Sequence, residues 1–490
     1  MSQYETPLFS GLIEHAKKDP VQFHIPGHKK GVGLDPEFRE YIGENVFKID
    51  LINISPLDDL HQPKGMIKKA QDLAAEAFGA DHTFFSVQGT SGAIMTMVMA
   101  VCGPGDKIIV PRNVHKSVMS AIVFTGAIPV FIHPEVDEKL GISHGITTDS
   151  VEKALQQHPD AKGVLVINPT YFGIAADLKE IVKIAHSYGV PVLVDEAHGV
   201  HIHFHEQLPI SAMQAGADMA ATSVHKLGGS MTQSSILNVK EGLVSVQRVQ
   251  SILSMLTTTS TSYLLLASLD VARKQLAIKG RELIQKSIDL ANDIRMEVNK
   301  INHLYCVGEE IVGTKAVFDI DPTKLIISVK DLGITGHDAE KWLREVYNIE
   351  VELSDLYNIL CIITPGDTEK EANILIQALQ HMSRQFEEYA RETTIEHVLL
   401  PDIPLLALTP RDAFYADTEV VPFEDSIGRI IAEFVMVYPP GIPIFIPGEI
   451  ITEDNLIYIQ KNIEAGLPVQ GPEDPELKTL RVIKEHKAIR

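Results

Sequence analysis

Short apolar runs alternate with helical patterns through the middle of this chain, and this alternation strongly limits how the chain can fold. Three runs, at 163–167, 189–194 and 218–224, each lead into polar residues. Between the first two, residues 177–189 carry apolar side chains three and four apart and end in a glycine, as amphipathic helices do. Strands that alternate with helices predict an α/β fold with a mostly parallel sheet.

Polar side chains stand at the end of each apolar run. Asn168 follows the first run and Asp195 the second, and the third ends in Ser223, His225 and Lys226. Ligands of open parallel sheets bind beyond the carboxyl ends of the strands. We therefore expect these side chains to gather at one edge of the sheet and to outline a pocket.

A glycine-flanked pair of hydroxyl residues, Thr90 and Ser91, leads into an apolar helical pattern within residues 86–101. Free N–H groups at the start of a helix, together with two hydroxyls, can bind a phosphate. The segment has neither the Walker pattern nor GxGxxG, so the anion need not be a nucleotide. An ordinary capped helix is the alternative interpretation.

Lys226 lies among glycines and small hydroxyl residues, which is an unusual place for a cation. An aspartate one strand away and a phosphate site nearby fit an amine that forms a Schiff base with pyridoxal phosphate. Asp195 would keep the pyridine nitrogen protonated, and Thr90, Ser91 and Ser223 would hold the phosphate. The alternative is an ordinary surface lysine after a strand.

Composition narrows the possible partners of this pocket. The 490 residues include 65 carboxylates and 43 lysines and arginines, which gives a formal net charge of −22. Nucleic acids and anionic membranes would be repelled, whereas a small cation would be attracted; acidity also serves solubility alone. Three widely spaced cysteines, no leader-like start and no apolar run long enough for a membrane span predict a soluble cytoplasmic protein.

The patterns divide the chain into four parts. We expect an N-terminal arm over residues 1–60, a large domain with a linking helix over 61–300, a small α+β domain over 301–385 and a C-terminal domain over 386–490. The linking helix is expected at about 263–302, where the pattern is long and amphipathic.

Two smaller patterns describe the part of the chain after the linking helix. Alternating residues at 317–329 and 351–365 predict half-buried strands, and helices are expected around 336–347 and 368–389. The proline-rich segment 437–452 cannot form a regular helix, so extended segments and turns are expected there.

The run ATSVHKLGGSMTQSS, residues 221–235, resembles the cofactor-attachment signature of the bacterial ornithine/lysine/arginine decarboxylases, which share the aspartate-aminotransferase fold type. The resemblance continues through FHIPGHKKG, DLHQPKG, QGTSGA, PRNVHKS, NPTYFG, DEAHG and YPPGIP, and covers essentially the whole chain. It is strongest to the short arginine decarboxylases of that family. The resemblance implies an aspartate-aminotransferase-like pyridoxal phosphate domain with a mostly parallel sheet, plus smaller α+β C-terminal domains.

The resemblance also implies roles for individual residues around the cofactor. His115 would stack on one face of the ring and Ala197 would lie against the other. His198 would lie beside the ring, and His225 would assist phosphate binding or proton delivery next to Lys226. Lys226 and Asp195 are then the residues on which catalysis depends.

Another implication concerns a neighbouring subunit. In the hydroxyl-rich segment TTTSTSY, Thr259 is the residue best placed to reach a neighbour's phosphate, which implies a homodimer or a larger homo-oligomer with shared active sites. This sequence has Thr261 where longer members are expected to have proline.

The implied activity is the decarboxylation of a basic amino acid, with arginine, converted to agmatine and carbon dioxide, as the expected substrate. Lysine is the alternative and ornithine the third choice. A substrate cation needs an acidic or carbonyl-lined wall, and Glu449, in a rigid PGE turn, is the first choice. The other C-terminal carboxylates considered are Asp412, Glu424, Asp425 and Glu433.

Other classes of protein remain as alternatives. His201, His203 and His205 would share one face if their segment were a strand, and that spacing can bind zinc in a metal-dependent hydrolase. We expect no metal, because Asp195 already has a role and no carboxylate pattern accompanies the histidines. A pyridoxal phosphate aminotransferase shares every cofactor residue and is the stronger alternative, whereas a non-catalytic scaffold would not need both Asp195 and Lys226.

Overall fold

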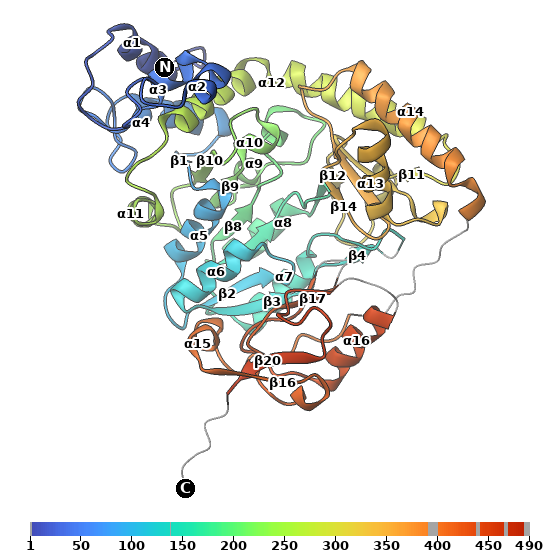
Figure 1. Ribbon diagram of the computed structural model, residues 1–490. Coiled ribbons are helices and arrows are strands. Elements are labelled where there is room, and N and C mark those ends of the chain that lie inside the picture. The colour runs from blue at the N-terminus through green and yellow to red at the C-terminus, as the bar shows by residue number, and fades with distance from the viewer. Residues whose placement is uncertain (1, 138, 391–399, 438–441, 465–468, 485–490) are drawn as a thin grey trace. The chain divides into compact units, whose positions relative to one another are not determined.

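The computed structural model describes residues 2–137, 139–390, 400–437, 442–464 and 469–484 (Figure 1). The chain divides into two compact units, each built from segments that are distant in the sequence. The predicted domain boundaries therefore stay predictions. The first unit comprises Met1–Val101, Ile167–Pro169 and Leu178–Gln285, and the second comprises Cys102–Val166, Thr170–Asp177 and Lys286–Arg490.

The largest sheet has seven strands in the order β1-β10-β9-β8-β6-β2-β3 (Figure 1). Strand β2 pairs in parallel with β3 and β6, and β8 pairs in parallel with β9. Strand β10 is antiparallel to both β1 and β9. The predicted α/β fold with a mostly parallel sheet is confirmed. The strands are β1 (His82–Ser86), β2 (Lys107–Pro111), β3 (Ile128–Ile132), β6 (Val164–Ile167), β8 (Val192–Asp195), β9 (Met219–Thr222) and β10 (Ser235–Val239).

The three apolar runs form the central strands β6, β8 and β9. Every residue of β8 and β9 is buried, as expected of parallel strands that are covered on both faces. The helix predicted at 177–189 is confirmed as α8 (Leu178–Ser187). Its buried face includes Ile181 and Ala185, whereas Lys183 is exposed.

Helices of the first unit surround its part of the sheet. Helix α5 is buried along most of its length, as its continuous apolar sequence requires. The long helix predicted at 263–302 is confirmed as α12 (Tyr263–Val298). The other helices of this unit are α1 (Pro7–Lys17), α2 (Pro36–Ile42), α3 (Glu44–Ile49), α4 (Met66–Phe78), α5 (Gly89–Val101), α9 (Ala212–Ala215), α10 (Val224–Leu227) and α11 (Val246–Leu256).

A buried ion pair holds the start of the chain against α12. Asp270 accepts a hydrogen bond from the backbone N–H of Leu8 at 2.9 Å and pairs with Arg273 at 2.7 Å. Arg273 also donates to the backbone carbonyl of Glu5 at 2.6 Å. Because both charges are buried and hydrogen-bonded, this pair fixes α1 to α12 within the first unit.

The second unit contains a small α+β layer, with a four-stranded sheet in the order β11-β13-β15-β14. The helices predicted at 336–347 and 368–389 are confirmed as α13 (Gly336–Tyr347) and α14 (Glu369–Gln385). The strands of this sheet are β11 (Tyr305–Cys306), β13 (Lys324–Ser328), β14 (Leu353–Ser354) and β15 (Asn358–Ile362), and other elements of the unit are α6 (Lys116–Thr125), α7 (Thr148–Gln157), β4 (Val136–Asp137), β5 (Ile142–Ser143), β7 (Ile174–Ala175) and β12 (Asp319–Ile320).

Strands form within 317–329 as predicted, but β13 is buried along its whole length rather than half-buried. Strands β12 and β13 occupy this stretch and belong to different sheets. Asp321 accepts hydrogen bonds from the backbone N–H and the hydroxyl of Thr323, at 2.9 and 2.7 Å. This local turn, which includes Pro322, interrupts the strand.

The C-terminal part of the second unit packs around an apolar cluster of its own. Residues 438–441 of the proline-rich segment lie outside the described residues, and the rest of that segment is extended or turned, as predicted. No helix in the described ranges has the length and apolar character needed to cross a bilayer. The C-terminal elements are α15 (Pro410–Tyr415), β16 (Thr418–Pro422), β17 (Val435–Val437), β18 (Ile442–Phe445), α16 (Glu453–Glu464), β19 (Val469–Gln470) and β20 (Thr479–Ile483).

Candidate active site

The predicted polar residues meet where the central strands end. The backbone N–H of Asn168 donates to the carbonyl of Asp195 at 3.0 Å, and the N–H of Glu196 donates to the carbonyl of Ala221 at 3.0 Å. These bonds bring the ends of β6, β8 and β9 together in the first unit. The backbones of Asn168 and Asp195 are therefore neighbours at this edge, whereas the predicted pocket of side chains stays a prediction.

Asp195 is the last residue of β8 and is only 5% exposed. Its carboxylate accepts a hydrogen bond from the backbone N–H of Ala197 at 3.2 Å. Burial raises the pKa of Asp195 to about 6, although the Ala197 hydrogen bond and the charge of Lys226 act in the opposite direction. A desolvated carboxylate of this kind gains from a bound cation, such as a protonated ring nitrogen.

Helix α10 follows β9 directly and carries the histidine and the lysine of the predicted site. Nζ of Lys226 lies 2.8 Å from Nε2 of His198, which is 6% exposed and lies in the turn after β8. His225 donates from Nδ1 to the carbonyl of Ser234 at 2.9 Å, and this bond orients its ring. Lys226 is exposed in the described chain, so its amine is accessible to a ligand.

Hydroxyl groups from three elements meet at the start of α5. The hydroxyls of Thr90 and Ser223 are hydrogen-bonded to each other, and Thr90 also bonds the hydroxyl of Ser235 at 2.8 Å. Ser91 lies beside Thr90 in the first turn of the helix, whose N–H groups have no partners within the helix. Hydroxyls at the N-terminus of a helix suit a phosphate.

These residues fit pyridoxal phosphate. The first unit brings together an accessible amine on Lys226, a buried carboxylate on Asp195, and hydroxyls of Thr90 and Ser223 at a helix N-terminus. These are the groups needed for the aldehyde, the ring nitrogen and the phosphate of that cofactor.

Sequence reasoning gave no role to two residues that the structure places in or beside this cluster, Ser235 and Glu196. Ser235 was part of the attachment signature but received no role, because the meeting of β10 with α5 is not visible in a local pattern. Glu196 is 3% exposed and lies directly after Asp195. A second carboxyl in a segment expected to be buried was the available signal for Glu196.

The other two cofactor predictions concern residues that the structure places in different surroundings. His115 belongs to the second unit, where it caps α6 by accepting a hydrogen bond from the N–H of Ser117 at 3.2 Å. Thr259 is exposed in the segment after α11, while neighbouring Thr257 is buried. Stacking by His115 and phosphate binding by Thr259 in a neighbouring subunit stay predictions.

Glu449 is fully buried and holds an arginine. Its two carboxylate oxygens accept hydrogen bonds from Arg112 at 2.6 and 2.8 Å, and one of them also accepts the N–H of Ile446 at 2.9 Å. Arg112 also donates to the carbonyls of Pro443 and Ile444 at 2.8 and 3.1 Å. The substrate role predicted for Glu449 stays a prediction. In this structure the cation that its carboxylate neutralises is Arg112.

The prediction of a strand through His201, His203 and His205 is wrong. The sheet strand ends at Asp195, and residues Ile202–Phe204 form a turn of 3-10 helix, so the three rings do not share a strand face. His203 bonds the hydroxyl of Ser211 at 2.9 Å, whereas His205 bonds the side chain of Gln285 at 3.0 Å. Within the described part of the chain, no group of three or more histidine, cysteine or acidic side chains is arranged to hold a metal.

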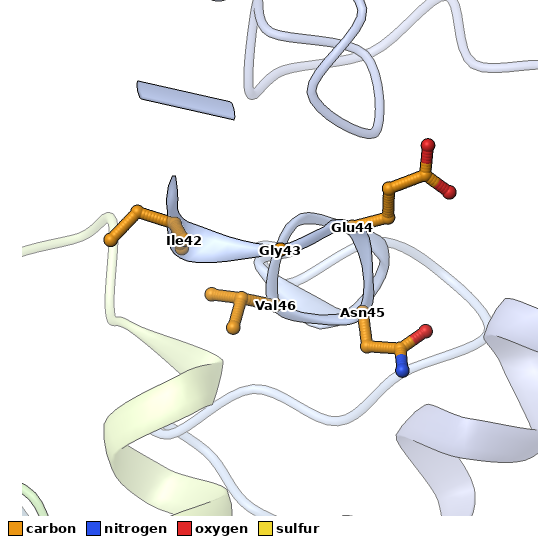
Figure 2. A pocket seen from close by; sticks show the side chains of 5 residues that line it. All are labelled: Ile42, Gly43, Glu44, Asn45 and Val46. Carbon is orange, nitrogen blue, oxygen red and sulfur yellow. The ribbon is translucent and has the colours of Figure 1, made fainter. Parts of the chain in front are cut away.

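A pocket lies elsewhere in the first unit. Figure 2 shows it at the junction of α2 and α3, lined by residues 42–46. The lining consists of Ile42, Gly43, Glu44, Asn45 and Val46, and it includes none of the predicted site residues. The candidate active site is the cluster around Lys226, because it holds the amine, the carboxylate and the hydroxyls described above.

Comparisons with known proteins show which family this chain resembles over its whole length. Models of the Orn/Lys/Arg decarboxylase family match residues 6–371, as the major domain, and residues 393–466, as the C-terminal domain. The arginine decarboxylases of Bacillus anthracis and Bacillus subtilis (strain 168) are each 74% identical over 489 residues, which is 100% of this chain and 99% and 100% of theirs. The crystal structure of the lysine decarboxylase of Francisella novicida superposes with a TM-score of 0.83 at 25% identity, and covers 98% of this chain and 81% of that chain.

Proposed function

This chain belongs to the Orn/Lys/Arg decarboxylase family, and on that premise we propose that it removes the α-carboxylate of arginine with pyridoxal phosphate, to give agmatine and carbon dioxide. One observation carries the choice of arginine: the 74% identity to arginine decarboxylases over the whole chain. Decarboxylation of lysine is the alternative, and ornithine is third. Agmatine is a polyamine precursor, so the enzyme supplies polyamine and spermidine biosynthesis.

When bound, the cofactor supplies an acceptor for the electron pair that the breaking bond between Cα and the carboxylate releases. Lys226 holds the cofactor covalently through Nζ, and Asp195 keeps the proton on the ring nitrogen. Thr90, Ser91 and Ser223 bind the phosphate. Contacts among Thr90, Ser223 and Ser235 support this role, because they place three hydroxyls together.

We assign a proton-transfer role to His198. A hydrogen bond between Nζ of Lys226 and Nε2 of His198, at 2.8 Å, needs one nitrogen with a proton and one with a free electron pair. The two side chains therefore share a proton. His198 can take a proton from the lysine amine or return one to it.

His225, His115 and Ala197 complete the proposed cofactor site. His225 assists the phosphate or proton delivery from its place beside Lys226, and the Nδ1 bond to Ser234 supports a fixed ring orientation. From the family resemblance, His115 would stack on one face of the cofactor ring and Ala197 would lie against the other.

We propose a homodimer or larger homo-oligomer in which Thr259 reaches a neighbour's phosphate. Its exposure supports this role. Large apolar side chains exposed in the N-terminal part of the first unit support an interface as well: Val21 is 82%, Phe23 95% and Tyr41 89% exposed. Cys306 and Cys361 are buried and form no disulfide, which supports a reducing cytoplasm as the compartment.

A substrate panel tests the proposed function. Purified protein loaded with pyridoxal phosphate is given arginine, lysine or ornithine, and carbon dioxide and the product amine are both measured. We expect the highest kcat/KM for arginine. A higher kcat/KM for lysine would overturn the choice of substrate, and transfer of an amino group to a keto acid without carbon dioxide would favour the aminotransferase alternative.

A further inference from the structure

Glu196 joins three elements beside the candidate active site. Its Oε1 accepts a hydrogen bond from the backbone N–H of Ala212, at the start of α9, at 2.7 Å. Its Oε2 accepts one from the hydroxyl of Thr222, the last residue of β9, at 3.1 Å. Because Glu196 directly follows β8, its side chain connects the ends of β8 and β9 with α9.

Tight packing fixes the side chain of Glu196 in this position. The turn after β8 folds over it, and the N–H of Gly199 donates to its carbonyl at 2.9 Å. A Cβ added at Gly199 would lie 2.7 Å from Cγ of Glu196 and 2.8 Å from Cδ of Pro169. The glycine of the DEAHG segment is therefore required for close approach to the Glu196 side chain.

The Glu196–Thr222 hydrogen bond connects the two ends of the proposed cofactor site. Asp195, next to Glu196, is assigned to the ring nitrogen, whereas Ser223, next to Thr222, is assigned to the phosphate. We propose that Glu196 is a positioning residue that sets the distance between Asp195 and Ser223, so that the site matches the length of the cofactor. This inference rests on the proposed function, because it uses the cofactor roles of those two residues.

Charge adds a second effect at the same position. Burial and the neighbouring Asp195 raise the pKa of Glu196 to about 7, despite the hydrogen bonds from Ala212 and Thr222. When Glu196 is ionised, its negative charge favours a proton on Asp195 or on a cation that Asp195 holds. Lys226 is the cation that faces Asp195 from α10 and opposes this effect.

Glutamine is the conservative replacement at this site. Its amide oxygen can accept from the N–H of Ala212, and its NH₂ group can donate to the hydroxyl of Thr222. Glu196→Gln thus keeps both hydrogen bonds and removes the charge. Glu196→Ala removes the two hydrogen bonds and the charge. Thr222→Val keeps the shape of the threonine and removes one contact.

The test measures cofactor affinity and catalysis separately. Cofactor-free protein is titrated with pyridoxal phosphate by fluorescence, and kcat and KM are then measured across pH for each variant. We expect Glu196→Ala to weaken cofactor binding about 10- to 100-fold, since the hydrogen bonds of a charged group are lost. Thr222→Val should weaken it less, and adding Thr222→Val to Glu196→Ala should cause no further loss.

Glu196→Gln should restore cofactor affinity to within about threefold of wild type and move the alkaline limb of the kcat profile to lower pH. Asp270→Asn is the matched control, because Asp270 is a buried carboxylate of the same unit that binds α1. This control should lower the melting temperature and leave cofactor affinity unchanged.

Two results would overturn the inference. One is a Glu196→Ala variant with a lower melting temperature but wild-type cofactor affinity and kcat, as in the control. The other is a Glu196→Gln variant that binds the cofactor as poorly as Glu196→Ala. If wild-type protein decarboxylates none of the basic amino acids, the proposed function fails, while the affinity measurements still test the positioning role.

Discussion

His198 and Lys226 form the contact on which proton transfer in the proposed reaction depends. We predict that His198→Phe, which removes both ring nitrogens, lowers kcat about 100- to 1,000-fold while cofactor is retained. Steady-state kinetics and the cofactor content of the purified variant measure this. His205→Phe is the matched control, since His205 is a buried histidine of the same run that bonds Gln285. Equal kcat values for the two variants would contradict the proton-transfer role of His198.

The raised pKa of the buried Glu196 predicts how the stability of the cofactor-free protein depends on pH. Burial raises the pKa of Glu196 to about 7 in the folded protein, above the ordinary value that it has in an unfolded chain, so the folded state binds the proton more tightly. The stability that this proton contributes is present at low pH and is lost as pH rises through 7. Between about pH 6 and about pH 8 the loss is about 1 kcal/mol.

Glu196→Gln has no carboxyl proton to lose. Between about pH 6 and about pH 8, its melting temperature should therefore rise relative to that of wild type. Differential scanning calorimetry of both cofactor-free proteins checks this. A difference in melting temperature that does not change with pH would contradict the raised pKa of Glu196.

Strand β2 of the second unit ends at the residue before Arg112, which pairs with Glu449 from the segment after β18. We predict that Glu449→Gln lowers the stability by about 3–5 kcal/mol, because it leaves the Arg112 charge buried without its counterion. The ratio of kcat/KM for arginine to that for lysine should not change. Thermal unfolding and the substrate panel measure the two effects, with the exposed Glu424→Gln as control.

An altered substrate ratio with an unchanged melting temperature would instead support the substrate role first predicted for Glu449. The pairing itself could not be predicted, because its two members are 337 residues apart in the sequence. The PGE turn marked Glu449 as a rigid carboxylate, but no local pattern shows which cation faces it.

Periodicity predicted the elements around the site well because the central strands are buried on both faces. The apolar runs that become β6, β8 and β9 end at Asn168, Asp195 and Ser223, and parallel strands bring such ends together. The pattern failed at His201–His205, where alternate histidines suggested a strand but the chain turns through a short 3-10 helix. His203 bonds Ser211 and His205 bonds Gln285, and a partner such as Gln285, 80 residues away in the sequence, is not visible in a local pattern.

At the scale of the whole molecule, the proposed sharing of active sites makes a prediction about mixed oligomers. Lys226→Ala lacks the amine, and Thr259→Asp would place a negative charge against the neighbour's phosphate. We predict that each variant alone is inactive and that mixed subunits recover about a quarter of wild-type activity, since a hybrid dimer has one intact site. Activity after verified subunit exchange measures this, and no recovery would count against shared sites.

The central claim is that Lys226 holds pyridoxal phosphate in an enzyme that decarboxylates arginine. The most direct measurement is to reduce the loaded protein with borohydride, digest it and locate the cofactor by mass spectrometry. We predict one reduced cofactor per chain, on the peptide that contains Lys226, and none on that peptide in Lys226→Ala, which should also release no carbon dioxide from arginine. Cofactor trapped on another lysine, or near-normal turnover by Lys226→Ala, would contradict this claim.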